Sequence, residues 1–180
     1  MPRPMNNSGP QIMMAALDPE GIYASTKKGF HIMTTPLSGD HQLMLDQVSG
    51  FNRAKRELGD DGKDLTLSLS RVAYVAKNES DRREKLEIAY EYYSRFDNVF
   101  TGPGIVNNGM IEILPRKQSI EELEQSLLIC STEEMIDKLS PYSEAGIDRV
   151  ILNMNFGASH KDTMNSIQSF AEKVVPHFSK

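Results

Sequence analysis

Short apolar runs alternate with longer amphipathic segments along the whole chain. The short runs predict strands, and the run over residues 11–17 suits a strand buried on both faces. Apolar residues at helical spacing predict the longer segments as helices. The predicted strands cover residues 11–17, 30–35, 64–76 and 150–155. The predicted helices cover residues 18–28, 40–58, 80–96, 119–129, 131–146 and 162–178.

Start and stop signals support these boundaries. Asp18 before Pro19 is typical of a helix start, and Ser119 with Glu122 forms a capping box. The apolar spacing also predicts which faces are buried. In the second helix these residues are Leu43, Val48, Phe51 and Ala54. In the last helix they are Met164, Ile167, Phe170, Ala171, Val174 and Val175.

Strands that alternate with helices predict an α/β fold with a parallel sheet and crossover helices. The pattern leaves two architectures open, a flavodoxin-like open sheet and part of a (β/α) barrel. A single domain spans residues 1–180, with an irregular lead-in at 1–10 and a Gly-rich irregular insertion at 97–118. The insertion is either a mobile lid or a variable surface segment.

Composition and charge exclude several classes of protein. Lys and Arg total 20 against 25 Asp and Glu, and the two signs are interspersed, so there is no basic stripe for nucleic acid. No apolar run approaches the roughly 20 residues of a membrane helix. Cys130 is the only cysteine, and the four histidines have no metal-ligand spacing, so we expect neither a disulfide nor a metal site. A reducing cytoplasm is the expected location.

Several segments in the right order resemble the bacterial-luciferase-like flavin-dependent monooxygenases. Residues 131–139 and 144–153 are similar to a helix start of the form G-[ST]-P-E-E-V that leads through E-A-G-[VI]-D into the last barrel strand. Residues 15–24 are similar to the family's A-A-S-S-P-E-x-x-x-W-A, and residues 170–176 match the family's closing helix. The resemblance covers nearly the whole chain but half of the family's fold.

The resemblance implies a partial (β/α)8 TIM barrel made of strands five to eight with their helices. It implies a luciferase-like oxidoreductase, a flavin-dependent monooxygenase that oxidises a small organic substrate with O2 and reduced flavin. The chain is then an incomplete unit of that enzyme, or a non-catalytic flavin-binding or partner subunit of the same family. An open α/β binding module unrelated to this family is the remaining alternative.

The implied cofactor is reduced FMN, with a deazaflavin as the other possibility. Because the flavin supplies the oxygen chemistry, no catalytic triad is required and the catalytic residues stay unassigned. Barrel enzymes bind ligands in the loops after the strands. The implied cofactor-binding residues in those loops are Leu17, Asp18, Glu20, Gly21, Thr34 and Thr35. Leu17 and Asp18 stand where the family pattern has serines, and a carboxylate there repels a phosphate.

Half a barrel leaves sheet edges unpaired and an apolar face open to water. We therefore expect a homodimer or a complementing half-barrel chain, with a small-molecule substrate and O2 as the other partners. Arg71 is the one charged residue within an otherwise uncharged predicted strand core, and it is expected to pair with an acid or to reach an anion.

Overall fold

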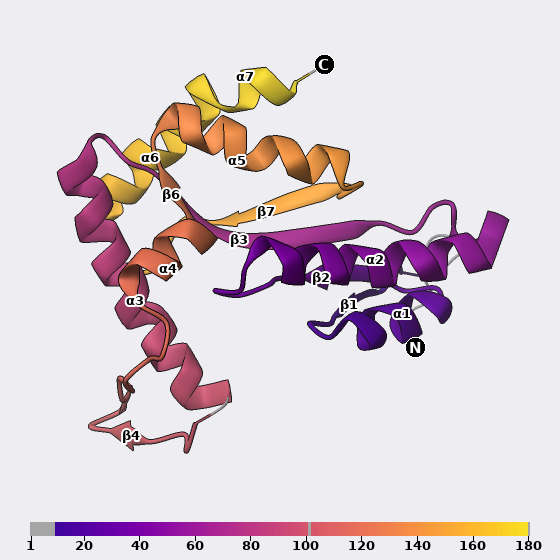
Figure 1. Ribbon diagram of the computed structural model, residues 1–180, viewed down its shortest axis with the longest axis horizontal. Coiled ribbons are helices and arrows are strands. Elements are labelled where there is room, and N and C mark those ends of the chain that lie inside the picture. The colour runs from indigo at the N-terminus through magenta and orange to yellow at the C-terminus, as the bar shows by residue number, and fades with distance from the viewer. Residues whose placement is uncertain (1–9, 101, 180) are drawn as a thin grey trace, which may run out of the picture. The chain divides into compact units, whose positions relative to one another are not determined.

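The computed structural model describes residues 10–100 and 102–179. The predicted lead-in falls almost entirely outside these residues. The described chain forms two compact units, one made of residues up to 37, 41–70 and 143–151, the other of residues 38–40, 71–142 and from 152 onward. Figure 1 shows the elements, coloured from indigo at the amino end to yellow at the carboxyl end.

Strands and helices alternate along the first part of the first unit. Its elements are β1 (Met13–Ala15), α1 (Pro19–Lys27), β2 (His31–Thr34), α2 (His41–Leu58), the short 3-10 helix η1 (Gly59–Gly62) and the first part of β3 (Leu67–Val75). β1 pairs with β2 and β2 pairs with β3, and both pairings are parallel. This confirms the predicted α/β fold with a parallel sheet.

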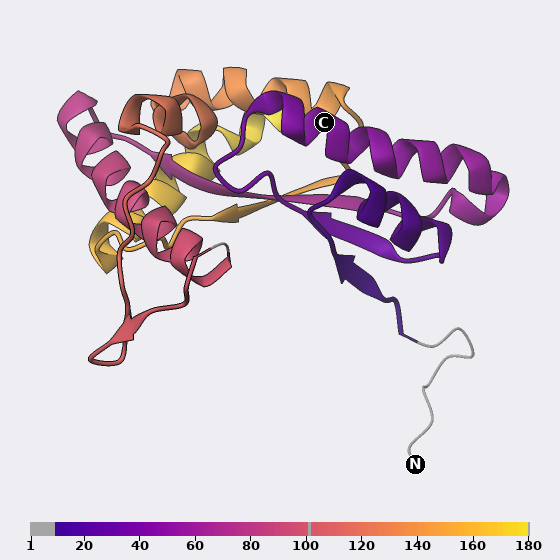
Figure 2. The ribbon, with the colours of Figure 1, turned by 60° about the horizontal axis from the view of Figure 1, so that its bottom comes forward.

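One face of this sheet is covered by helices. Ile32 lies opposite Leu67 and Thr34 opposite Leu69, and all four side chains are buried. Met33 points to the other face and is exposed. Figure 2 shows α1 and α2 on the same side of β1, β2 and the start of β3. The buried face of α2 includes Val48, Phe51 and Ala54 as predicted, whereas Leu43 is exposed.

The two helices of the first unit approach each other closely at Gly50. A Cβ atom at this position would lie 2.4 Å from the carbonyl oxygen of Pro19 in α1. Because any side chain would clash with the backbone there, only glycine permits this crossing.

The second unit is built around the end of β3. Its other elements are α3 (Glu79–Phe100), β4 (Val106–Asn107), β5 (Met110–Ile111), α4 (Ile120–Ser126), β6 (Leu128–Cys130), α5 (Thr132–Glu144), α6 (His160–Lys173) and α7 (Val175–Phe178). β7 (Arg149–Asn153) begins in the first unit, ends in the second and pairs with β3. β3 and β6 are parallel, with Ala73 opposite Leu128 and Val75 opposite Cys130.

Strand β6 corrects the prediction of a helix over 119–129. The capping box of Ser119 and Glu122 is present, but the helix ends at Ser126 and Leu127 is extended, with ψ of 162°. Leu128, Ile129 and Cys130 are fully buried as a strand. The apolar run satisfies both helical and strand patterns, and pairing with β3 decides between them.

The irregular segment after α3 contains a small hairpin. α3 continues to Phe100, four residues beyond the prediction, and β4 and β5 then pair antiparallel. Asn108 and Gly109 form the turn with φ of 49° and 77°. The base is held by the buried side chain of Asn98, whose amide donates to the carbonyl of Glu112 at 2.8 Å and accepts from the N–H of Ile105 at 2.9 Å.

The last helix buries a different face from the predicted one. Met164 is 50% exposed and Ile167 40% exposed, while Thr163 and Ser166 are buried. Ser166 accepts a 2.7 Å hydrogen bond from the backbone N–H of Val75. Phe170 is half-buried, Ala171 and Val175 are exposed, and Val174 alone is fully buried as expected. The prediction for this helix was therefore largely wrong, because spacing shows which face is apolar but not what covers it.

Within the described residues, no helix combines the length and the apolar character needed to cross a membrane.

Candidate functional site

The loops that follow β1 and β2 are joined by one buried side chain, Gln47 of α2. Its Nε2 donates to the carbonyl of Leu17 at 2.8 Å and to the carbonyl of Thr35 at 3.0 Å. Gln47 is 1% exposed, and within the described chain its Oε1 atom has no hydrogen-bond partner. These bonds bring two predicted site residues together at the carboxyl ends of neighbouring parallel strands.

Asp18 caps the amino terminus of α1. Its carboxylate accepts a 2.8 Å hydrogen bond from the N–H of Gly21, and Pro19 occupies the first helical position. A helix amino terminus attracts anions through its free N–H groups and its dipole. Here the protein's own carboxylate uses the N–H of Gly21, so this donor is not available to a phosphate.

The other predicted site residues have local partners. Glu20 forms two hydrogen bonds with Arg53 Nη2, at 2.8 and 2.7 Å, on the surface between α1 and α2. Thr35 Oγ1 accepts from the N–H of Leu37 at 3.0 Å. Thr34 is buried on the helix-covered face of the sheet, and Leu17 exposes its side chain. The six residues therefore form a capped helix start and two tied loops, not one convergent pocket.

A second cluster, absent from the sequence-based expectations, lies at the end of β3. Lys85 of α3 is 1% exposed and its Nζ lies 3.3 Å from Asp81, 2.7 Å from Glu84 and 3.5 Å from Asp162. Tyr74 donates its hydroxyl to Asp81 at 3.3 Å. The spacing of Asp81 and Lys85 by four residues on a helix was the signal in the sequence.

The charges in this cluster shift one another's pKa values. Burial opposes charge on Lys85, yet hydrogen bonds to Glu84 and Asp81 raise its pKa above the usual range for lysine. The ion pair with Lys77, at 2.8 Å, and a hydrogen bond from Ser159 hold the pKa of Asp162 well below its usual range. Burial, then the charge of Asp81, raise the pKa of Tyr74. The directions of these three pKa shifts favour a charged Lys85, a charged Asp162 and a neutral Tyr74, and the ion pair of Lys85 with Asp162 links α3 to α6.

Arg71 has no carboxylate partner among the described residues. It is 5% exposed and donates to the backbone carbonyl of Ser126, while its Nε and Nη1 atoms are buried without a partner in the part of the chain that the structure covers. Of the two expectations for Arg71, an acid partner is not found among the described residues, and contact with an anion stays a prediction.

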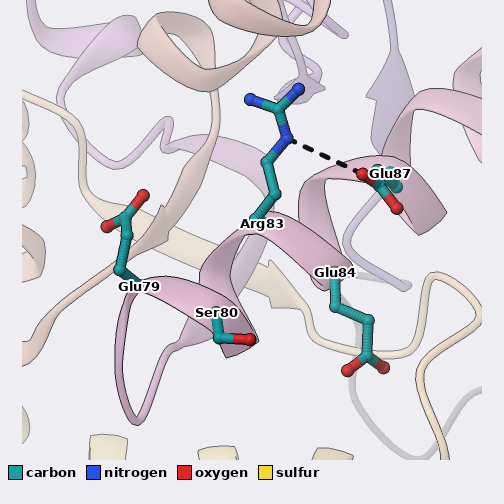
Figure 3. A pocket seen from close by; sticks show the side chains of 5 residues that line it. All are labelled: Glu79, Ser80, Arg83, Glu84 and Glu87. Carbon is teal, nitrogen blue, oxygen red and sulfur yellow. Dashed lines mark ion pairs between the residues drawn. The ribbon is translucent and has the colours of Figure 1, made fainter.

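Described residues of the second unit line at least two hollows. The first, shown in Figure 3, is lined by Glu79, Ser80, Arg83, Glu84 and Glu87. All five belong to α3, and Arg83 is paired with Glu87 at 3.7 Å, so this hollow is the charged surface of one helix. The second has a volume of about 480 Å³ and is lined by Ser38, Gly39, Asp97, Gly102, Leu114, Pro115, Arg116, Lys117 and Gln118. It brings together the loop after β2 and the segment after the hairpin.

No group of three or more His, Cys, Asp or Glu side chains within the described residues is arranged to hold a metal ion. Cys130 is buried, and burial raises the pKa of its thiol to about 11, so the thiolate is scarce at neutral pH.

A search of protein-family models finds no match to this chain. Among curated proteins, the oxygenase component of the flavin-dependent trigonelline monooxygenase of Acinetobacter baylyi is 25% identical over 187 residues. The match covers 99% of this chain and 51% of that protein, so the chain spans about half the length of its curated relative.

Solved structures show the same half-length relation. A monooxygenase from Streptomyces bottropensis matches with a TM-score of 0.73 and 18% identity, over 99% of this chain and 51% of that one. An F420-dependent secondary alcohol dehydrogenase matches with a TM-score of 0.67 and 16% identity, over 97% and 50%. The oxygenating constituent of 3,6-diketocamphane monooxygenase from Pseudomonas putida, a type II Baeyer-Villiger monooxygenase in complex with FMN, matches with a TM-score of 0.64 and 13% identity, over 93% and 48%.

The structural matches establish the likeness of fold, and the curated relative adds a sequence match along the whole chain. Together they confirm the resemblance to the luciferase-like flavin-dependent monooxygenases, over 93–99% of this chain and about half of each relative.

Proposed function

We propose that this chain is the carboxyl-terminal half of a luciferase-like (β/α)8 barrel, part of a monooxygenase that oxidises a small organic substrate with O2 and reduced flavin. The observation that carries the proposal is the alignment of 99% of the chain with 51% of a flavin-dependent monooxygenase component. β1, β2, β3 and β7 would be barrel strands five to eight, and β6 a short additional strand. Residues 1–180 would then form one half-barrel domain, with the cytoplasm as its expected location.

The exposure of β1 supports the proposal that a second half of the barrel is required. All three residues of β1 are exposed, and within the described chain β1 pairs only with β2. Strands inside a parallel barrel are buried and paired on both sides. The proposal therefore includes four further β/α units, supplied by a longer form of this polypeptide, by a complementing chain or by a second copy.

The FMN phosphate does not fit the predicted residues at the start of α1. The carboxylate of Asp18 already accepts from the N–H of Gly21, and a second anion beside it would be repelled. Thr34 is buried away from the open face of the sheet. In this proposal the chain contributes wall and loops to the site, and the phosphate of a flavin or deazaflavin is held by groups outside this chain.

The Asp18 carboxylate at the start of α1 also favours a second candidate, a non-catalytic flavin-binding or partner subunit of the same family. A chain that has lost its phosphate contact can still complete a barrel for another subunit. The two candidates differ in one measurable property, because only the first supports oxygen-dependent turnover of reduced flavin once the barrel is complete.

Light scattering and urea unfolding of the purified chain test the half-barrel proposal. We expect self-association, or a poorly cooperative transition, because an exposed sheet face and the outer edge of β1 have no partner within the described chain. A monomeric chain with a single sharp unfolding transition would contradict the proposal.

FMN titration, followed by flavin fluorescence, tests the cofactor assignment. The chain alone is expected to bind FMN no more tightly than about millimolar, and Asp18→Ser is expected to bind it more tightly because the anion competitor is removed. Asp46→Ser, a change of an exposed acid on α2, is the matched control. Equal FMN binding by the chain and by Asp18→Ser would show that the start of α1 does not limit phosphate binding.

A further inference from the structure

The hollow between the loop after β2 and the segment after the hairpin is built around a buried guanidinium. The Arg116 side chain is 5% exposed. Its Nη2 atom donates to Ser38 Oγ and to Gln118 Oε1, each at 2.8 Å. Gln118 in turn donates to the carbonyl of Ser38 at 2.9 Å. These bonds place the guanidinium beside the loop and fix its plane.

The guanidinium has donor capacity beyond these bonds. Arg116 Nε is buried and has no hydrogen-bond partner in the described part of the chain. Nη1 lies 3.1 Å from Asp97 Oδ2, as an ion pair without a well-formed hydrogen bond. The Asp97 side chain is 44% exposed, so water can reach the acid that faces Arg116. Arg116 is therefore held in place by the neutral groups of Ser38 and Gln118 and faces one solvent-accessible acid, Asp97.

The wall of the hollow is both apolar and cationic. Leu114 and Pro115 supply the apolar part, and Lys117 adds a second positive charge. The guanidinium carbon of Arg116 lies 5.4 Å from the ring centre of Tyr93, which keeps its inner side dry. Two cations face one carboxylate, so the hollow has a net positive charge.

We propose that this hollow binds a small organic carboxylate. The ligand carboxylate pairs with Arg116 in place of Asp97, and the apolar body of the ligand rests on Leu114 and Pro115. A carboxylate matches the planar fork of a guanidinium, and a bond to a charged donor is roughly twice as strong as a neutral one. Inorganic phosphate shares the charge but has no apolar body to bury. The site lies within one compact unit and does not depend on the proposed monooxygenase function.

Titration of the full chain by isothermal calorimetry or NMR tests this site with three probes, benzoate, benzamide and inorganic phosphate. We expect benzoate to bind about tenfold more tightly than benzamide, which has the same shape without the charge. Benzoate is also expected to bind more tightly than phosphate. Equal binding of benzoate and benzamide would overturn the proposal, and tighter binding of phosphate would overturn the assignment of a carboxylate.

Two variants make the test specific. Asp97→Asn removes the competing acid, so benzoate affinity should rise several-fold, while Arg116→Gln should lower it about tenfold. Glu91→Gln on the same helix is the matched control for Asp97→Asn, because Glu91 pairs with Arg95 and does not line the hollow. If Arg116→Gln fails to fold, Asp97→Asn decides, since an unchanged or weaker affinity in that variant contradicts the proposal.

Discussion

Helices α2 and α6 carry similar apolar stripes, but only the stripe of α2 is buried. Met44, Val48 and Phe51 of α2 are each less than 5% exposed. In α6, Met164 and Ile167 are 50% and 40% exposed, and small polar residues take the buried positions. The difference teaches that the described chain covers the α2 stripe almost completely, whereas it leaves much of the α6 stripe exposed.

Both helices nevertheless bury a polar side chain that bonds to the backbone of a neighbour in the same unit. Gln47 of α2 donates to the carbonyls of Leu17 and Thr35. Ser166 of α6 accepts from the N–H of Val75. The helices thus differ in their apolar contacts more than in their polar ones, and four substitutions separate these contributions.

Phe51→Ala is expected to have the largest effect. It removes a ring that is 1% exposed in the core of the first unit, and large-to-alanine changes in cores cost about 3–5 kcal/mol. Urea unfolding followed by circular dichroism measures the loss. A loss below about 1 kcal/mol would show that the stripe of α2 is not packed as described.

Gln47→Leu is expected to have the second largest effect and to lower the free energy of unfolding by about 1–3 kcal/mol. The carbonyls of Leu17 and Thr35 lose their donor, while the side-chain volume is nearly kept. Gln42→Leu is the control, since Gln42 is exposed and its side-chain amide donates to Asp46 one turn away on the same helix. If both variants unfold at the same urea concentration, the bridge between the two loops contributes nothing to stability.

Ser166→Ala is expected to cost about 1 kcal/mol, since one backbone N–H, rather than two carbonyls, loses its partner. Hydrogen exchange at Val75 gives a second readout, and its amide should exchange faster in the variant. Unchanged exchange at Val75 would contradict the hydrogen bond to Ser166.

Ile167→Ala should change the stability of the chain by less than about 0.5 kcal/mol, as is usual for an exposed side chain away from special features. The same variant should weaken self-association or binding of a complementing half-barrel, which light scattering measures. A loss comparable to that of Phe51→Ala, without a change in association, would mean that α6 is covered by this chain itself.

The pattern of the sequence predicts element type better than element environment. Helix starts with a capping residue, such as Asp18 and Ser119, lie where the sequence puts them. Strand β6 was missed because three apolar residues after a helix fit either structure, and only pairing with β3 selects the strand. The inward face of α6 was mispredicted for a related reason, since a periodic pattern cannot show whether a partner is present.

In the candidate sites, too, local contacts could be predicted from the sequence and long-range contacts could not. The cap formed by Asp18 was readable because a side chain bonds to a backbone three residues away. Gln47 and Arg116 were not, since their partners Leu17 and Ser38 lie 30 and 78 residues away and no motif marks either residue. Long-range polar contacts of this kind leave no periodic signal in a single sequence.

The close crossing of α1 and α2 depends on the absence of a Cβ atom at Gly50. Because a Cβ at position 50 would meet the Pro19 carbonyl at 2.4 Å, every substitution of Gly50 has to push the start of α1 outward. Asp18, which immediately precedes Pro19, would travel with it. A substitution at position 50 can therefore change the geometry of the loop after β1, although it replaces no side chain of that loop.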